Sequence, residues 1–245
     1  MDEELEKMLK YLGLRGLITN WDYYIDLAKQ GSFSSVRLLK YVVEQEYKTK
    51  QENARKRRIS LAKMPEPFVI ETFPFDRQPK LNKKMILTLY DCFDYMTKQQ
   101  NIIWIGPTGT GKTGLATAFL TQAIDRGYRG KFILFPELVE TLYQSLADHS
   151  EKKVLEAFAA YDCLLIDELG LIEIDPVQVG LFFSLMHKRH KKKTTLITSN
   201  LGFDQWGSFL KNTQLTAALV DRLTENSHVI NMKNCKSLRN RLDQQ

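Results

Sequence analysis

The octapeptide GPTGTGKT at residues 106–113 constrains the fold of this chain more than any other stretch. It follows the apolar run NIIWI (101–105), and a helical pattern begins near Lys112. The octapeptide has the form GxxxxGK[ST] between a strand and a helix, which is the setting in which this motif binds phosphate. Its glycines let the backbone turn tightly, so that successive N–H groups can surround phosphate oxygens, and the helix N-terminus favours an anion. We therefore predict a nucleotide site where the first strand of a parallel sheet ends.

Two side chains of this loop have predicted roles in holding the nucleotide. Lys112 is expected to reach the β- and γ-phosphates of ATP, and the hydroxyl of Thr113 is expected to ligate Mg²⁺. ATP and Mg²⁺ are therefore the expected cofactors. The predicted cofactor-binding residues are Gly106, Pro107, Thr108, Gly109, Thr110, Gly111, Lys112 and Thr113.

The run CLLIDE (163–168) is an apolar strand that ends in two carboxylates. Burying two carboxylates at the end of a strand costs free energy unless they bind a ligand or take part in catalysis. Asp167 is expected to hold Mg²⁺ through its water shell, and Glu168 to polarise the water that attacks the γ-phosphate. Many phosphotransferases and switch GTPases with the same loop lack the adjacent glutamate. The pair therefore favours hydrolysis over phosphoryl transfer to a small acceptor.

Asn200 directly follows another apolar strand, TTLITS (194–199). The carboxyl ends of parallel strands meet at one edge of a sheet, where ligands bind. We therefore expect Asn200 beside the phosphate loop and the Asp167–Glu168 pair, where its amide can bond the γ-phosphate and the attacking water. A turn-forming asparagine is the structural alternative. The aromatic residues that follow are expected to pack and fix the next loop.

The sequence pattern divides the chain into two regions. Residues 1–66 have helical periodicity, which predicts a small all-helical domain. Its expected role in DNA binding and assembly comes from the basic run at its end and from a family resemblance, and not from the periodicity. The prolines of MPEPF (64–68) end that pattern because proline lacks the amide donor, and residues 67–82 are expected to form an extended linker. In 83–245 helices alternate with short apolar runs, which indicates an α/β ATPase domain with a five-stranded parallel sheet covered on both faces. The strands are expected at 101–105, 131–135, 162–166, 194–199 and 228–232.

Bulk properties predict a soluble cytoplasmic protein. No stretch approaches the roughly 18 apolar residues that indicate a membrane span. The N-terminus, MDEELEKMLK, is charged and unlike a signal peptide. Cys92, Cys163 and Cys235 form no CxxC pair, which argues against disulfides and a zinc site.

Two basic runs are candidates for DNA contact. The net charge is +6 and the isoelectric point is about 9.1. The cations are concentrated in ARKRR (54–58) and HKRHKKK (187–193), and each run is compatible with a DNA-phosphate surface or with a merely solvated face. The candidate contacts in these runs are Arg55, Lys56, Arg57, Arg58, Lys188, Arg189, Lys191, Lys192 and Lys193.

Arg222 lies near the end of the helical stretch TAALVDRLTENSHVINM (216–232). It can form a structural ion pair with Asp221, or it can act on the nucleotide of a neighbouring subunit. Both interpretations remain open. Arg239 and Arg241 in the tail are weaker candidates for the same role in trans.

Four segments in this order and spacing resemble IstB-like transposition helper ATPases, which belong with the DnaC and DnaA types to the initiator branch of AAA+ proteins. The segments are GPTGTGKT, CLLIDELG, TTLITSNLGFDQWGSF and AALVDRLTENSHVINM, and the resemblance covers nearly the whole chain. It places Lys112 and Thr113 in the Walker A motif and Asp167 and Glu168 in the Walker B motif. It also makes Asn200 the sensor-one residue, and it places Arg222 in the arginine-finger region.

The chain departs from the family pattern at two positions. Gly202 replaces the usual proline of the SN-L-P-F signature, which is expected to loosen that turn, and Leu238 replaces the tyrosine of an S-Y-R tail pattern. The chain is also expected to lack a C-terminal helical lid, in agreement with the IstB pattern and unlike DnaA.

The resemblance implies an ATPase that forms a homo-oligomer on duplex DNA and assists an IstA-like transposase in target selection and strand transfer. ATP binding would assemble the oligomer, and hydrolysis would remodel or disassemble it. Lys152 and Lys153 fall where initiator-branch proteins carry an additional DNA-facing helix. The expected DNA contacts are mainly to phosphate and therefore depend on salt.

Three other functions compete with this interpretation. A DnaC-like replicative helicase loader shares the core and binds its helicase through the N-terminal region. A nucleotide-gated DNA scaffold would bind ATP without needing hydrolysis by Glu168. A small-molecule kinase is the third alternative, and the Asp167–Glu168 pair argues against it.

Overall fold

The computed structural model describes residues 1–31, 33–211 and 213–239 of the chain. It forms two compact units, Met1–Arg57 and Arg58–Gln245, and the division falls inside helix α4 (Ser35–Ala62). The sequence pattern predicts a boundary at residue 66 instead. A helix that continues across a boundary shows no break in its periodicity there, so the pattern could not locate the division.

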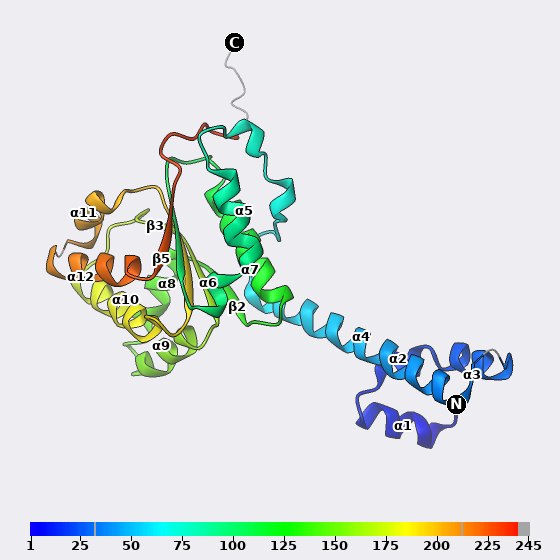
Figure 1. Cartoon of the computed structure of the whole chain (residues 1–245). Coiled ribbons are helices and arrows are strands. Elements are labelled where there is room, and N and C mark those ends of the chain that lie inside the picture. Colours follow the sequence, from blue (N-terminus) through cyan, green and yellow to red (C-terminus); the bar gives the residue numbers. More distant parts are fainter. Residues whose placement is uncertain (32, 212, 240–245) are drawn as a thin grey trace, which may run out of the picture. The chain divides into compact units, whose positions relative to one another are not determined.

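The N-terminal unit (Met1–Arg57) is helical, as predicted (Figure 1). The side chain of Asp2 caps the first helix by accepting a 2.7 Å hydrogen bond from the Leu5 N–H. The Glu46 carboxylate on α4 accepts the Leu17 N–H at 2.8 Å and so ties the second helix to α4. Before α4 the unit contains α1 (Glu3–Tyr11), α2 (Arg15–Thr19) and α3 (Trp21–Lys29).

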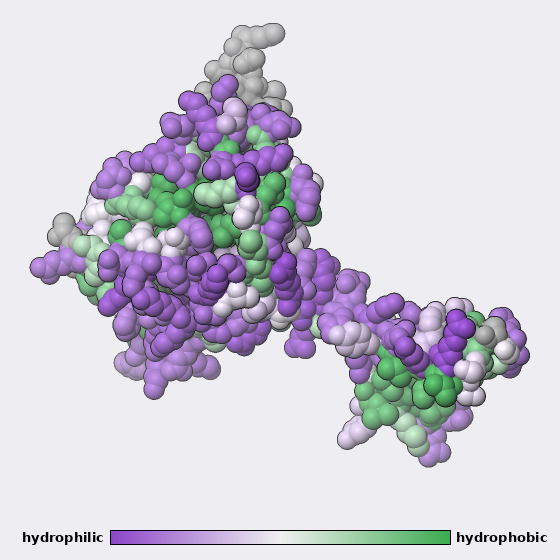
Figure 2. All heavy atoms as spheres, viewed as in Figure 1, coloured by the Kyte–Doolittle hydropathy of each residue, from purple (hydrophilic) through white to green (hydrophobic). Residues whose placement is uncertain are grey.

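One face of α4 in this unit exposes large apolar side chains. Val36, Leu39, Val43 and Tyr47 are 79, 66, 58 and 63% exposed, and their spacing places them along one side of the helix. Figure 2 shows hydrophobic residues gathered on this unit, and in the same view the C-terminal unit has both hydrophilic and hydrophobic areas. The N-terminal unit therefore carries an apolar stripe that its own helices do not cover.

The C-terminal unit (Arg58–Gln245) is built on one parallel sheet with strand order β2-β3-β4-β1-β5. This confirms the predicted α/β class and the predicted five strands. It also places β4 between β1 and β3, so the segments that follow these three strands lie side by side at the carboxyl edge of the sheet. The strands are β1 (Asn101–Ile105), β2 (Gly130–Leu134), β3 (Cys163–Leu169), β4 (Thr194–Ser199) and β5 (Ser227–Asn231).

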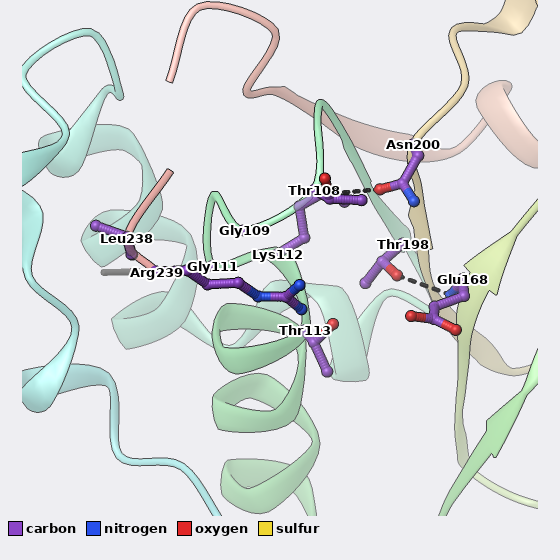
Figure 3. A pocket seen from close by; sticks show the side chains of 10 residues that line it. All are labelled: Thr108, Gly109, Gly111, Lys112, Thr113, Glu168, Thr198, Asn200, Leu238 and Arg239. Carbon is purple, nitrogen blue, oxygen red and sulfur yellow. Dashed lines mark hydrogen bonds between the residues drawn. The ribbon is translucent and has the colours of Figure 1, made fainter. Parts of the chain in front are cut away.

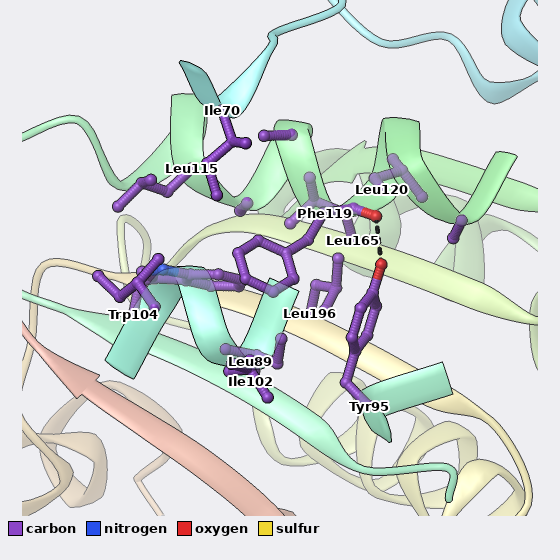
Figure 4. Packing of buried hydrophobic residues seen from close by; sticks show 14 of the residues in the cluster. Ile70, Leu89, Tyr95, Ile102, Trp104, Leu115, Phe119, Leu120, Leu165 and Leu196 are labelled. Carbon is purple, nitrogen blue, oxygen red and sulfur yellow. Dashed lines mark hydrogen bonds between the residues drawn. The ribbon is translucent and has the colours of Figure 1, made fainter. Parts of the chain in front are cut away.

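Alternate strand residues pack on opposite faces of the sheet, and helices cover both faces (Figure 1). On one face Trp104 packs with Phe119, and Tyr95 donates a 2.7 Å hydrogen bond to the Phe119 carbonyl (Figure 4). The helices on that face are α5 (Lys83–Cys92), α6 (Asp94–Thr97) and α7 (Lys112–Asp125). The helices on the other face are α8 (Phe135–Gln144), α9 (Glu151–Ala159), α10 (Pro176–Arg189), α11 (Trp206–Leu210) and α12 (Thr213–Thr224).

Residues 67–82, expected to be a linker, are part of the core of the C-terminal unit. They form two short 3-10 helices, η1 (Ile70–Thr72) and η2 (Phe75–Arg77). Ile70 and Phe73 are 1 and 4% exposed and pack in the same cluster as Trp104. The prolines end the long helix, but the apolar residues after them determine where the chain lies.

The loop after β4 is anchored by aromatic residues, as expected. Trp206 is fully buried and contacts Phe203, which lies in η3 (Phe203–Gln205), and Phe209. At Gly202, where the family pattern has proline, the backbone N–H donates to the Gln205 side chain at 3.1 Å.

The described chain continues after β5 to residue 239 without a further helix. Within the described ranges no helix has both the length and the apolar character needed to cross a bilayer.

Candidate nucleotide-binding site

The phosphate loop connects β1 to the first residue of α7. Gly109 and Gly111 have φ values of +80° and +95°, which side chains rarely tolerate. A Cβ at Gly111 would also lie 2.6 Å from the Phe73 ring. Backbone conformation and close packing therefore both require glycine at position 111.

The Lys112 side chain is held by three acceptors at the carboxyl edge of the sheet. Its Nζ donates to the carbonyls of Gly106 and Pro107 at 2.7 and 2.8 Å, and to Oδ1 of Asn200 at 2.7 Å. Burial lowers the pKa of Lys112 to about 8, although the negative charges of Asp167 and Glu168 oppose that shift. The structure thus brings the predicted lysine and the predicted asparagine together.

Asp167, near the end of β3, is buried, and its carboxylate accepts hydrogen bonds from two threonine hydroxyls. The Thr113 hydroxyl lies 3.0 and 3.1 Å from its two carboxylate oxygens. The hydroxyl of Thr198 on β4 donates to the same carboxylate. The two predicted magnesium ligands are therefore adjacent, and a threonine from the neighbouring strand orients the carboxylate.

Glu168 has an unusual backbone conformation with φ of +61°. The register between β3 and β4 shifts between Ile166 and Leu169, which marks an irregularity at this residue. Its N–H donates to the Thr198 hydroxyl at 3.1 Å, and its carboxylate points into the pocket (Figure 3). The irregularity thus directs successive carboxylates to different positions around one site.

These elements enclose a cavity of about 250 Å³. Backbone of the phosphate loop, the Lys112 ammonium and the Glu168 carboxylate all reach it, which is the combination required to hold a phosphate chain next to a base (Figure 3). It is lined by Thr108, Gly109, Gly111, Lys112, Thr113, Glu168, Thr198, Asn200, Leu238 and Arg239.

Arg222 does not line this cavity. Its guanidinium lies over the Phe183 ring at 4.4 Å, and one of its nitrogens, Nη1, is buried with no hydrogen-bond partner in the described part of the chain. Among those residues no ion pair joins it to Asp221. The ion-pair interpretation therefore has no support in this structure.

Arg189 corrects the predicted DNA surface. It is 1% exposed, and its guanidinium donates to the carbonyls of Phe158, Tyr161 and Thr194 and to the Thr195 hydroxyl. Burial lowers the pKa of Arg189 to about 10, so the group stays charged near neutrality. Arg189 is a structural residue that satisfies carbonyl groups at the end of α9 and the start of β4, and its burial keeps it from contacting DNA. A run of cations in a sequence does not reveal that one of them faces the core.

Several other predicted DNA contacts form ion pairs or hydrogen bonds within the chain. Lys191 pairs with Glu225, and Lys193 pairs with Asp162 at 2.5 Å. Arg58 donates to the Ile124 carbonyl at 3.3 Å, and Arg55 lies 3.6 Å from the Glu52 carboxylate. The exposed candidates are Lys56, Arg57, Lys152, Lys153, Lys188, Lys191 and Lys192, and of these Lys56 lies 4.0 Å from the Glu52 carboxylate.

The sequence interpretation missed several residues of the site. Thr198 had a weak signal, since it is a hydroxyl in an apolar strand two residues before Asn200. Gln78, whose side-chain amide donates to the Thr110 carbonyl of the phosphate loop at 3.2 Å, had no signal, because it falls in the predicted linker. Arg239 was considered only for a neighbouring subunit, yet it lines the cavity of its own chain. Arg241 lies outside the described residues.

The chain is similar to known proteins along most of its length. Residues 7–245 match the family model described as IstB-like ATP binding protein. A protein of Geobacillus stearothermophilus, whose name assigns it to insertion sequence IS5376 as an ATP-binding protein, is 30% identical over 233 residues, which are 95% of this chain and 92% of the relative. A counterpart named for insertion sequence IS21 in Pseudomonas aeruginosa is 28% identical over 230 residues, covering 94% and 86% of the two chains.

Among solved structures, the DnaC helicase loader is similar in fold. The match has a TM-score of 0.55 at 21% identity and covers 73% of this chain and 99% of the loader chain. The strand order, the phosphate loop and this likeness show a P-loop α/β fold like that of the DnaC loader. Because the family model matches residues 7–245, almost the full length of this chain, the chain belongs to the IstB-like ATP binding protein family.

Proposed function

We propose that this chain is an ATP-hydrolysing, DNA-binding helper of transposition. The observation that carries the proposal is that Lys112, Thr113, Glu168 and Asn200 line one cavity, with Asp167 bonded to Thr113 at its edge. The names of relatives that belong to insertion sequences support the biological setting.

In this proposal the loop binds the phosphates of ATP. Its backbone N–H groups and the Lys112 ammonium contact the β- and γ-phosphates. The Thr113 hydroxyl and the Asp167 carboxylate fit Mg²⁺, because they are adjacent oxygen donors of the hard type that this ion prefers. When bound, Mg²⁺ would neutralise negative charge that develops on the phosphates.

Glu168 is the proposed general base. Its carboxylate accepts a proton from water as the water oxygen bonds to the γ-phosphorus, and the bond from that phosphorus to the bridging oxygen breaks. The products are ADP and inorganic phosphate. Asn200 is proposed to hydrogen-bond the γ-phosphate and the attacking water, since its amide already lies next to Lys112.

A homo-oligomer is proposed to complete the site. Arg222 lies outside its own chain's cavity, so any action on a nucleotide has to be on that of a neighbouring subunit. The exposed stripe of Val36, Leu39, Val43 and Tyr47 also supports association with another copy, because apolar side chains in a row favour burial. ATP would assemble this oligomer on duplex DNA.

DNA contact is proposed for the exposed cations and not for Arg189. Lys152 and Lys153 occupy the first turn of α9 and are exposed, and Lys56 and Arg57 are exposed on α4. Such side chains contact phosphates and so give salt-dependent binding with little base readout. An IstA-like transposase is the proposed protein partner.

Phosphate release measured with and without duplex DNA tests this function. We expect the wild-type chain to hydrolyse ATP faster when DNA is present, and the Glu168→Gln variant to bind ATP and DNA with turnover reduced at least about 100-fold. A variant that still supports transposition without turnover would favour the non-hydrolysing scaffold. Capture of a replicative helicase, and not of the transposase of the same element, would favour a helicase loader.

A further inference from the structure

In the described part of the chain, the outer edge of β2 has no strand beside it. β2 is the terminal strand of the sheet and pairs only with β3. The Arg129 carbonyl accepts the Cys163 N–H at 3.2 Å, and alternation along the strand then turns the backbone groups of Lys131 toward β3 as well. The backbone groups of Phe132 and Leu134 therefore face away from β3, where an edge strand offers hydrogen bonds to another chain.

A groove runs along this edge. Its volume is about 560 Å³, compared with about 250 Å³ for the nucleotide cavity, and residues 131–134 of β2 all line it. Pro65 and Phe158 add apolar surface on either side of the strand, and Glu137 in the first turn of α8 adds a carboxylate. The groove lies within the C-terminal unit and shares no lining residue with the nucleotide cavity.

Two lysines line the groove and form no ion pair in the described part of the chain. Lys63 follows the end of α4, and its neighbours Ala62 and Met64 pack in the core of the unit and so fix its place. Burial lowers the pKa of Lys131, and the positive charge of Lys63 lowers it further, while Glu137 opposes the shift. An anion between the two ammonium groups would relieve their repulsion.

We propose that this groove binds an extended acidic segment of a partner protein, which adds to β2 as a further strand and places carboxylates against Lys63 and Lys131. Main-chain hydrogen bonds to β2 would supply part of the affinity, and the side chains that line the groove would supply the specificity. The proposal does not depend on ATP binding, because the groove is separate from the nucleotide cavity.

A peptide fits these features better than duplex DNA does. The apolar surface of Pro65 and Phe158 and the Glu137 carboxylate are unfavourable beside a continuous polyanion. A peptide can instead place carboxylates two residues apart on one side and apolar side chains on the other. The outward backbone groups of Phe132 and Leu134 include both donors and acceptors, which a peptide backbone matches and phosphate groups, which only accept, do not.

Selection from a library of random dodecapeptides displayed on phage tests the occupant, with the full chain as the immobilised target. We expect the enriched peptides to carry carboxylates at alternate positions among β-branched residues. One such peptide, synthesised with a fluorescent label, is then titrated with each variant and followed by anisotropy. Lys63→Glu and Lys131→Gln should each weaken its binding about tenfold or more, which is the contribution of one hydrogen bond between charged groups.

Lys80→Glu is the matched control, because it reverses the charge of an exposed lysine outside the groove. Its peptide affinity should stay within about twofold of wild type, and the thermal unfolding of every variant should resemble that of wild type. Lys63 is exposed, so its reversal tests the groove even if the half-buried position 131 does not tolerate change. No enrichment, enrichment without acidic residues, or equal binding by wild type and Lys63→Glu would overturn the proposal.

Amide exchange followed by nuclear magnetic resonance locates the bound peptide. The peptide should slow exchange of the Phe132 and Leu134 amides, because these groups face the added strand. Duplex DNA should neither slow their exchange nor displace the peptide. Displacement by DNA, together with loss of DNA binding in Lys63→Glu, would assign the groove to DNA and overturn the proposal.

Lysines at an edge strand can also serve only to prevent association between copies of a chain. In that case Lys63→Glu and Lys131→Gln would self-associate in light scattering, and the selection would yield no acidic peptide. The proposal expects the opposite pair of results, in which both variants keep the mass of wild type and lose the peptide.

Discussion

Nζ of Lys112 lies 2.7 Å from Oδ1 of Asn200, 88 residues further along the chain. The contact exists because β4 pairs directly with β1, so that the residue following β4 reaches the loop following β1. It ties the group proposed to bind the phosphates to the group proposed to sense them. Any change in the charge of Lys112 should therefore affect both.

Binding of ATP should depend on pH through Lys112. Burial lowers the pKa of this residue to about 8, so the ammonium is lost as the pH rises through that value. ATP affinity should fall about tenfold between pH 7.5 and pH 9, measured by titration calorimetry. Lys112→Arg stays charged and should lack this decrease. The same decrease in Lys112→Arg would exclude Lys112 as its source.

The same pKa shift makes folding more favourable as the pH rises, whereas it makes ATP binding less favourable. The unfolded chain binds the Lys112 proton more tightly than the folded chain, because the ordinary value of 10.5 is higher than about 8. The contribution of this group to the free energy of unfolding should therefore rise between about pH 8 and pH 10.5, and Lys112→Arg should remove that part of the rise.

Thr198 should matter for turnover although it carries no charge. Its hydroxyl donates to Asp167 and accepts the Glu168 N–H, so Thr198→Val removes support from both carboxylate residues. We expect turnover to fall about 10- to 100-fold, and the Mg²⁺ concentration needed for half-maximal rate to rise. Thr198→Ser keeps the hydroxyl and should retain most of the activity. Equal activity of the valine and serine variants would show that the hydroxyl is not needed.

The positions at strand ends could be predicted from sequence, while those that depend on the path of the whole chain could not. Lys112, Asp167 and Asn200 each follow or end an apolar strand, and parallel pairing brings strand ends together whatever the connecting segments do. Gln78 and Arg239 reach the site through segments without periodicity, so only tertiary packing places them. For Arg189 the charge pattern was misleading, because the arginine is turned inward between exposed lysines.

Arg189 should contribute to stability and not to DNA binding. Arg189→Met would leave buried carbonyls of Phe158, Tyr161 and Thr194 without a donor, which should lower the free energy of unfolding by about 3 kcal/mol or more. Urea unfolding followed by circular dichroism measures this change. The adjacent exposed Lys188→Ala should stay within about 0.5 kcal/mol of wild type. A stable Arg189→Met chain with weakened DNA binding would contradict this assignment.

Lys152 and Lys153 should contribute to DNA binding through phosphates. Reversing both to glutamate should weaken duplex binding and lower the magnitude of the slope of log K against log salt by about 2. Fluorescence anisotropy across a salt series measures both quantities. Reversing Lys83 and Lys84 at the start of α5 makes the same charge change elsewhere and should have a smaller effect. An unchanged slope after reversal at 152 and 153 would remove α9 from the DNA surface.

ATP bound at Lys112 is proposed to gate assembly on duplex DNA, and hydrolysis by Glu168 is proposed to end it. Electron microscopy of the Glu168→Gln chain with duplex DNA, in ATP and in ADP, tests this most directly, with Lys112→Ala as the control. We expect regular oligomers on DNA in ATP, few in ADP, and none with Lys112→Ala in either nucleotide. Identical assemblies in ATP and ADP, or assembly by Lys112→Ala, would contradict it.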